Sequence, residues 1–256
     1  MLCFSTWASF VIHDVLKYLI PAGGMALLTG FVLAGRFSRR KIQKTTPQRR
    51  QILREIAWSL VSAVIFASVS LLAVFGLAEW SLNRLYFDVS EWGWPYLAAS
   101  VLGMIVAHDA YFYWAHRLLH LRLMLRFTHR VHHRSRTPTP WTAYSFDPFE
   151  AVVQVAFGPL WVLLVPTHPL ALLLWSIHMV LRNVIGHSGY EVFPRNWARN
   201  RWLGWVTAVT HHDLHHQNAR WNFGLYFTWW DRLMGTEHPD YLANFDRAVN
   251  VRHHVV

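Results

Sequence analysis

The sequence predicts an all-α fold: a polytopic membrane helical bundle with about four to five membrane segments, including a helical hairpin, and a cytoplasmic histidine-rich helical cap. Three observations support this prediction. Hydrophobic residues make up 54% of the chain and charged residues 15%, whereas soluble domains carry roughly a quarter charged residues. Long uncharged runs recur along the chain, and its 15 Trp and 16 Phe residues are typical of membrane interfaces. We expect a single integral-membrane domain over residues 1–256.

Two uncharged runs come first, at residues 18–35 and 56–78. A membrane helix needs about 20 residues, and both runs are of that order. Residues 36–54 between them are rich in arginine and lysine, which is the pattern of a cytoplasmic loop. Because basic residues concentrate there, the net charge of +10 indicates membrane topology, and we expect no nucleic-acid partner.

The later segments are expected to return the chain to the cytoplasmic side. Residues 92–107 are apolar and lead without a break into a histidine-rich sequence, so one helix should leave the membrane carrying those histidines. Residues 151–181 are uncharged but interrupted by prolines, which predicts a helical hairpin turning near residues 166–169. With the slightly acidic connection 79–91 outside, all histidine clusters meet at one cytoplasmic face. We expect a multi-pass protein of a bacterial inner membrane.

Most of the 17 histidines fall into four clusters, HDAYFYWAHRLLH, HRVHH, HSGYE and HHDLHH. Two clusters share the spacing HxxHH, and the first contains a pair four residues apart. Residues i, i+3 and i+4 lie on one face of a helix, so each of these clusters can direct two or three imidazoles at one point. Imidazole is the commonest protein ligand for transition metals. The candidate ligands are His116, His120, His129, His132, His133, His187, His212, His215 and His216.

Nine imidazoles are too many for one ion, because a structural zinc takes four ligands and a catalytic zinc three. They divide naturally between two ions that each keep an open position. Nitrogen ligands without thiolates favour iron, copper, nickel or zinc over magnesium and calcium. His108 and His211 are possible further ligands. The single cysteine, Cys3, excludes an intrachain disulfide and a CxxC site.

The remaining histidines are expected outside the metal site. His178 lies in an apolar run and is interpreted as a core residue, with a ligand role as the alternative. The others are interpreted as interfacial, turn or tail residues: His13, His168, His238, His253 and His254.

Carboxylates near the clusters are candidates to orient the ligands. A ligating histidine usually donates its second ring N–H to a carboxylate or a carbonyl. Asp109 and Asp213 are the predicted partners because they lie within or beside the clusters. Glu150 and Asp147 follow the second cluster, but Asp147 precedes a proline and is better explained as a helix cap.

In combination, these motifs resemble the fatty acid hydroxylase and sterol desaturase superfamily of membrane di-iron oxygenases. The resemblance covers a histidine-rich catalytic region of about residues 107–235 and includes HHDLHHQNARWNFGLYFTWWDRLMGT. It implies two iron ions (Fe2+/Fe3+) held by the nine histidines, with His187 as the isolated ligand. Some acyl-chain hydroxylases of the superfamily carry a histidine four residues earlier, where this chain has Asn183. The second iron would then have one histidine fewer, or an Asn, a water or His211 in its place.

The resemblance also implies an activity: an enzyme that uses O2 and two electrons to hydroxylate or desaturate a lipid, such as a sterol or a fatty acyl chain. The chain lacks the HPGG haem motif of relatives fused to a cytochrome domain, so a separate reductase or electron carrier is the expected redox partner. The lipid tail would enter from the bilayer between helices. Candidate wall residues, with interfacial anchoring as the alternative role, are Trp141, Tyr144, Phe146, Phe149 and Trp175.

Two other classes of protein stay open on the residues alone. One is a membrane zinc hydrolase, since ligand type does not separate zinc from iron. The other is a non-catalytic metal-binding or transport protein. A transporter would place its ligands within crossing helices, whereas these clusters follow the ends of the apolar runs.

Overall fold

The computed structural model describes residues 4–249, and every regular element in this range is helical. Only isolated β-bridges occur beside the helices of the described range, as between Lys41 and Tyr190. The all-α class is therefore confirmed. The long helices and the short segments that join them are α1 (Phe4–Leu27), the π-helical continuation η1 (Leu28–Leu33), α2 (Ala34–Arg36), η2 (Ser38–Arg40), α3 (Arg49–Glu79), η3 (Val89–Glu91), α4 (Gly93–Leu119), α7 (Pro148–Val155), α8 (Phe157–Leu164) and α9 (Pro169–Gly186).

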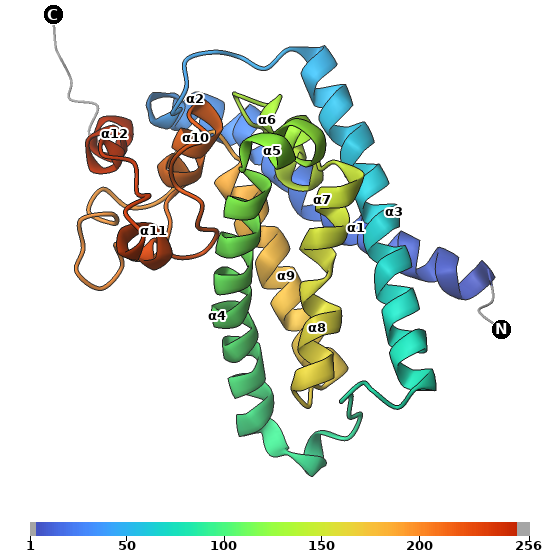
Figure 1. The fold of residues 1–256 in the computed structure, drawn as a ribbon. Coiled ribbons are helices and arrows are strands. Elements are labelled where there is room, and N and C mark those ends of the chain that lie inside the picture. Colours follow the sequence, from blue (N-terminus) through green and yellow to red (C-terminus); the bar gives the residue numbers. More distant parts are fainter. Residues whose placement is uncertain (1–3, 250–256) are drawn as a thin grey trace, which may run out of the picture.

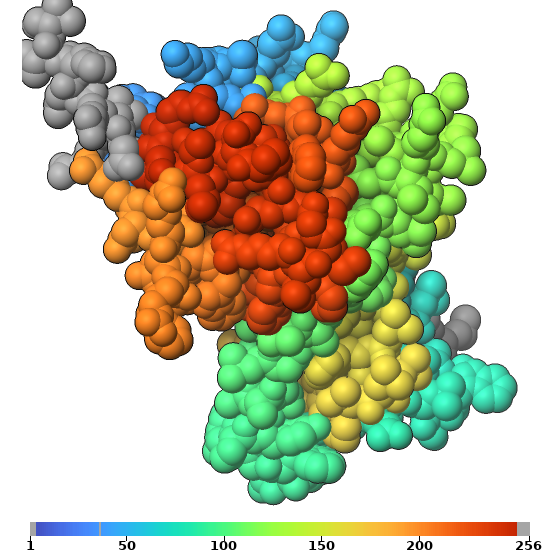
Figure 2. Space-filling model, turned by 60° about the vertical axis from the view of Figure 1, so that its left-hand side comes forward, coloured from blue at the N-terminus to red at the C-terminus, as the bar shows by residue number. Residues whose placement is uncertain are grey.

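The cap is made of short helices and loops that follow the long ones: α5 (Arg122–Thr128), α6 (Arg130–His133), η4 (Pro140–Tyr144), α10 (Val209–Gln217), α11 (Trp229–Leu233) and α12 (Tyr241–Val249). Figure 1 shows α10, α11 and α12 gathered beside the upper end of α4. Figure 2 shows that this red and orange part covers only the upper portion of α4, whose lower half projects below it.

Three helical segments are long and apolar enough to cross a membrane: Phe4–Leu33, Arg49–Glu79 and Pro169–Gly186. The first begins well before the predicted start at residue 18. Its polar side chains Asp14 and Lys17 lie one turn apart and form an ion pair, so they neutralise each other and the helix continues through them. Figure 1 shows α1 running obliquely behind α7, across the upper part of the bundle.

The predicted helical hairpin is present. Helices α7 and α8 run one way and α9 returns beside them, with the turn at residues 165–168. His168 ends this turn, because its Nδ1 accepts a hydrogen bond of 3.0 Å from the backbone N–H of Leu170. Helix α4 likewise continues without a break from the apolar run into the first histidine cluster, as predicted.

The two ends of the bundle are held by different polar contacts. At one end, Arg84 N–H donates to Val162 O at 2.8 Å and Arg84 O accepts from Thr167 N–H at 2.9 Å, which joins the 79–91 connection to α8 and the hairpin turn. At the other end, the buried carboxylate of Glu55 accepts hydrogen bonds from Ser135 and Thr139 at 2.6 and 2.5 Å. Gln43 of the basic loop donates to Arg136 O at 2.8 Å, so this loop lies at the same end as the histidine clusters, as the sequence predicts.

Candidate metal centre

The nine predicted ligands gather into two groups, and the members of each group place one ligand atom within 4.8 Å of one another. We call them the first group and the second group. The first group contains His116, His120, His129, His133 and His215. The second group contains His132, His187, His212 and His216.

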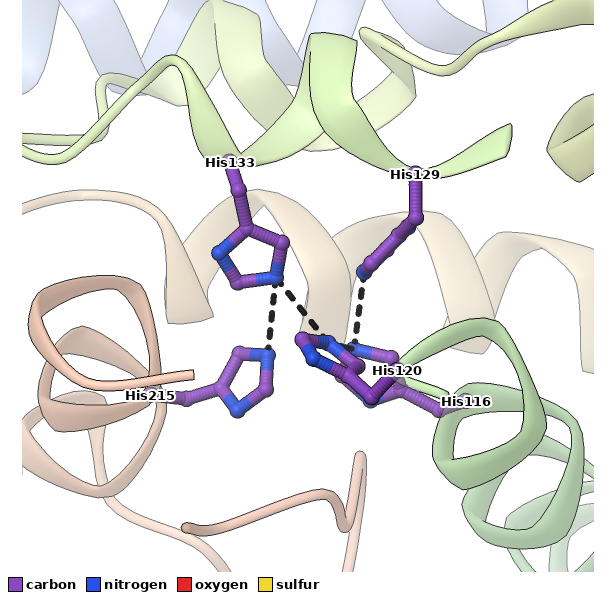
Figure 3. A group of neighbouring side chains, drawn as sticks. All are labelled: His116, His120, His129, His133 and His215. Atoms are coloured by element: carbon purple, nitrogen blue, oxygen red, sulfur yellow. Dashed lines mark hydrogen bonds between the residues drawn. The ribbon is translucent and has the colours of Figure 1, made fainter. Parts of the chain in front are cut away.

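The first group joins three parts of the chain (Figure 3). Helix α4 supplies His116 and, at its end, His120; the α5–α6 segment supplies His129 and His133; and α10 supplies His215. Their Nε2 atoms lie close together, at 3.2 Å between His116 and His129 and 3.1 Å between His133 and His215. One point can therefore be surrounded by five imidazoles.

The second group lies beside the first. His187 follows the end of α9, His132 comes from α6, and His212 and His216 lie one turn apart on α10. The Nε2 atom of His187 is 2.9 Å from that of His212 and 3.1 Å from that of His216. The ring of His132 packs on His216 with 4.7 Å between centroids.

The hydrogen bonds of the opposite ring nitrogens show that these sites fit metal ions. Nδ1 of His116 donates to Phe223 O at 2.9 Å, Nδ1 of His187 to Asn183 O at 2.7 Å, and Nδ1 of His215 to Trp221 O at 2.6 Å. A carbonyl oxygen only accepts, so Nδ1 carries the proton and Nε2 of each neutral ring carries a lone pair. These lone pairs converge with the other imidazoles of their groups, an arrangement that a cation satisfies.

Burial keeps the imidazoles neutral. It lowers the pKa of His129, His132 and His212 well below the ordinary histidine value, and the neighbouring imidazoles lower it further. The same causes lower the pKa of His215 and His216. Neutral imidazole is the form that binds a metal ion, so burial favours the ligating protonation state.

Within residues 4–249, the buried carboxylate that contacts one of the nine histidines is that of Glu150 in α7. Its Oε1 lies 2.7 Å from Nδ1 of His129, an ion-pair distance, although the contact does not have regular hydrogen-bond geometry. Asp147 occupies the position before Pro148 at the start of α7, as expected, but its side chain accepts from Val131 N–H at 2.8 Å instead of capping α7.

The two carboxylates predicted to orient ligands have other partners. Asp109 accepts from the backbone N–H groups of Tyr226 and Phe227 and from Trp229 Nε1, at 2.8, 3.2 and 2.7 Å. Asp213 accepts from Gln43 and Gln217, and burial raises its pKa to about 6. Neither forms a hydrogen bond or ion pair with a histidine in the described part of the chain. Proximity in sequence was misleading because α4 and α10 turn these side chains away from the rings.

The loop that carries the carbonyls of Trp221 and Phe223 is held by Asp231, which the sequence analysis missed. Asp231 accepts from Phe223 N–H and Gly224 N–H, both at 2.8 Å. A Cβ atom on Gly224 would come 2.4 Å from the carbonyl oxygen of Phe227, so only glycine fits. The signal was the run WNFGLYFTWWDRLMGT, which belongs to the resemblance but contains no histidine.

The two possible further ligands lie outside both groups. His108 is hydrogen-bonded through Nδ1 to the hydroxyl of Tyr226 at 2.9 Å. His211 is fully buried with Nε2 3.4 Å from Asp231 Oδ2, and burial lowers its pKa to about 3. Asn183, at the divergent position, donates its side-chain amide to Ala143 O at 2.6 Å and meets His187 through its backbone oxygen.

The isolated histidines are also outside the groups. His178 is half-buried against the Tyr226 ring, with 4.7 Å between centroids, in agreement with a core position. His168 and His238 accept backbone hydrogen bonds in turns, as expected. His13 is an exposed residue of α1. Cys3, His253 and His254 lie outside the described residues.

A large cavity of about 580 Å3 adjoins the second group. It lies between α1, α3, α8 and α9, and most of its wall is apolar. Phe146 lines it and also packs on His132 at 5.2 Å between centroids, while Phe112 lines it and packs on His116 at 5.0 Å. Tyr144, Phe146 and Trp175 line the cavity as predicted; Trp141 and Phe149 are not among its lining residues.

Comparison with known proteins identifies relatives that match most of the chain. Methylsterol monooxygenase 1 of Rattus norvegicus is 27% identical over 237 residues, which cover 91% of this chain and 77% of the relative. Delta(7)-sterol 5(6)-desaturase ERG3B of Gibberella zeae is 29% identical over 200 residues, covering 78% and 60%. Lathosterol oxidase of Rattus norvegicus is 28% identical over 194 residues, covering 75% and 63%. No solved structure matches the chain.

A family model described as fatty acid hydroxylase matches residues 101–236. This range is more than half of the chain and contains all nine histidines of the two groups. The relatives are oxidoreductases. The chain therefore belongs to the fatty acid hydroxylase family and is an oxidoreductase.

Proposed function

We propose that this protein oxidises a membrane lipid, by hydroxylation or desaturation, with two iron ions, O2 and two electrons. The observation that carries the proposal is the shared wall between an apolar cavity and two groups of convergent imidazoles. Cavities of roughly 300–1,000 Å3 hold small organic ligands, and this one measures about 580 Å3. Phe112 and Phe146 are in contact with the cavity on one side and with candidate ligands on the other.

The two groups would each hold one iron ion. When bound there, iron would supply the activation of O2 that oxidation of an unactivated C–H bond needs. The protein's own part is to orient the ligand rings, exclude water and position the lipid. The carbonyls of Phe223, Asn183 and Trp221 fix ring orientation through Nδ1, and the aromatic wall at Phe112 and Phe146 keeps water from the side that faces the lipid.

The names of the relatives support a sterol or a related lipid as the substrate, since they act on methylsterol, Delta(7)-sterol and lathosterol by their descriptions. A rigid sterol and a folded acyl chain both fit a cavity of this volume. We also propose that the whole of residues 1–256 is one integral-membrane domain, with its catalytic region at about residues 107–235, close to the range of the family match.

Electrons are proposed to come from a separate acidic protein that binds an arginine-lined groove. The groove has a volume of about 490 Å3 and includes His133, a half-exposed member of the first group. No arginine of the groove forms an ion pair with a carboxylate in the described part of the chain. Charge complementarity of this kind steers redox partners together. The arginines are Arg122, Arg126, Arg130, Arg134 and Arg136.

The histidine end is proposed to face the cytoplasm, because the basic loop lies there. The expectation of a bacterial inner membrane has no support from the relatives, which are eukaryotic. Cysteine labelling in intact cells tests the sidedness, with Cys3→Ser to remove the native thiol and Ser90→Cys or Lys44→Cys to mark the two ends. Both side chains are exposed. If only Lys44→Cys is labelled from outside, the protein has the opposite orientation.

The test of the activity is a turnover assay with labelled oxygen. The full chain is loaded with Fe2+ without oxygen, supplied with a reductase and carrier, and given 18O2 and a membrane lipid extract. We expect a lipid that gains one labelled oxygen or loses two hydrogens. His215→Ala should abolish this, and His168→Ala, a turn histidine, should not. Conversion that continues undiminished without O2 would contradict the oxygenase and support the zinc hydrolase.

A further inference from the structure

The apolar cavity contains a buried ion pair. Asp14 and Lys17 of α1 line it, and Asp14 is only 5% exposed. They pair with each other one turn apart, and neither forms another hydrogen bond or ion pair within residues 4–249. Ionisable side chains in membrane segments are energetically costly and mark functional sites. The ion pair has no structural partner outside α1, so its place on the cavity wall points to a ligand.

A second polar group on this wall lacks a partner. Tyr144 is 1% exposed, lines the cavity, and its hydroxyl has no hydrogen-bond partner in the described part of the chain. Its ring stacks on Tyr18 with 5.1 Å between centroids, whereas the hydroxyl of Tyr18 donates to Trp141 O at 2.9 Å. A buried hydroxyl without a hydrogen-bond partner costs free energy unless a ligand supplies the missing hydrogen bond.

Asp14 and Tyr144 line the same cavity and are close enough for a charge interaction. Burial raises the pKa of the Tyr144 phenol well above its ordinary value, and the nearby charge of Asp14 raises it further. The phenol is thus a hydrogen-bond donor at neutral pH, next to a carboxylate that accepts. Two ring contacts lead from Tyr144 toward the metal centre: Tyr144 to Phe146 at 6.4 Å and Phe146 to His132 at 5.2 Å between centroids.

We propose that Asp14 and Tyr144 bind the hydroxyl group of a neutral lipid and hold it near the second group. A hydroxyl both donates and accepts: its proton would go to the Asp14 carboxylate, and its oxygen would accept from the Tyr144 phenol. Lys17 balances the charge of Asp14, so the pair presents no net charge to a ligand. A fatty-acid carboxylate would meet a second carboxylate there, which disfavours it.

The proposal rests on the proposed function and narrows it. The substrate would be a lipid with a hydroxyl, because the anchor lines the same cavity as Phe146, which packs on His132. Free fatty acids would bind weakly. Asp14 and Tyr144 would then set which lipid the enzyme accepts without touching the metal ions.

Direct lipid binding tests this inference. The metal-loaded full chain in nanodiscs, without reductant or O2, is mixed with tritiated cholesterol or 1-octadecanol, and each is compared with its own methyl ether. We expect the wild type to bind the alcohol of at least one pair about tenfold more tightly than the ether, because the ether oxygen can accept from Tyr144 but has no proton to donate to Asp14, and one hydrogen bond has about this value. Asp14→Ala should remove this preference and leave ether binding unchanged, whereas Tyr144→Phe should weaken the binding of alcohol and ether alike.

Tyr18→Phe is the matched control, because it removes a hydroxyl from the stacked neighbour whose hydrogen bond is internal. It should keep the preference for the alcohol. Tyr144→Phe breaks no hydrogen bond of the protein, and ether binding to Asp14→Ala reports that the cavity is intact. Equal affinity for alcohol and ether in both pairs, a preference that survives Asp14→Ala, or unchanged affinities in Tyr144→Phe would overturn the anchor. These binding measurements involve no oxidation, so their outcome is independent of the outcome of the turnover assay.

Discussion

Nδ1 of His129 lies 2.7 Å from Oε1 of Glu150, and both side chains are buried. Glu150 belongs to α7, so this contact ties a membrane-side helix to the first group of imidazoles. A carboxylate beside the second ring nitrogen of a ligating histidine fixes the orientation of the ring and makes the other nitrogen a stronger metal ligand. The first prediction follows from this contact.

Glu150→Gln should weaken metal binding at the first group by about 10- to 100-fold, the usual effect of losing such a partner. Titration with Fe2+ under anaerobic conditions measures it. Asp213→Asn is the comparison, because Asp213 is bonded to Gln43 and Gln217 and to no ring. Loss of metal in Asp213→Asn with normal binding in Glu150→Gln would mean that the carboxylate roles are reversed.

Adjacent histidines are predicted to serve different ions. His132 belongs to the second group and His133 to the first, and the same division separates His216 from His215. Each single change to alanine should lower the metal content from about two ions per chain to about one, by elemental analysis of fully loaded protein. His132→Ala with His216→Ala should still retain one ion, whereas His132→Ala with His133→Ala should retain none. A wild-type content of one ion or less would refute the two-metal centre.

A larger side chain on α8 can fill part of the cavity. Gly158 lines it, and a Cβ atom there meets nothing within 4 Å, so Gly158→Leu should project into the space that the lipid occupies. We expect a raised KM or lost turnover at unchanged metal content. Gly24→Leu on α1 is the control, since its Cβ also meets open space but it does not line the cavity. Equal effects of both changes would show that the cavity is not the lipid site.

The arginine groove predicts a salt-dependent interaction with the electron donor. Arg126→Glu with Arg130→Glu should raise the KM for an acidic carrier at least several-fold, and added salt should reduce the difference, because exposed charges are screened. Arg195→Glu changes an exposed arginine outside the groove and should have little effect. Reduction by small neutral reductants should be equal in all three proteins. An unchanged KM in the double variant would place the donor elsewhere.

Much of the fold and of the site followed from patterns along the chain. The apolar runs predicted α3, α4 and the α8–α9 hairpin because a helix in lipid must be long and uncharged. The spacing HxxHH predicted convergent ligands because residues three and four apart share a helical face. The start of α1 was misjudged, since Asp14 and Lys17 neutralise each other only once they are one turn apart on a helix.

Only the tertiary structure decided how the ligands are divided and what surrounds them. Consecutive residues of a helix point about 100° apart, so His132 and His133 must diverge, but the packing of α6 against α10 determines which imidazoles each one meets. The same holds for Glu150, which contacts His129 from another helix, and for Asp14 and Tyr144, which line one cavity although they are distant in sequence. Spacing along a chain encodes directions within one helix; distances between helices arise only when their side chains pack.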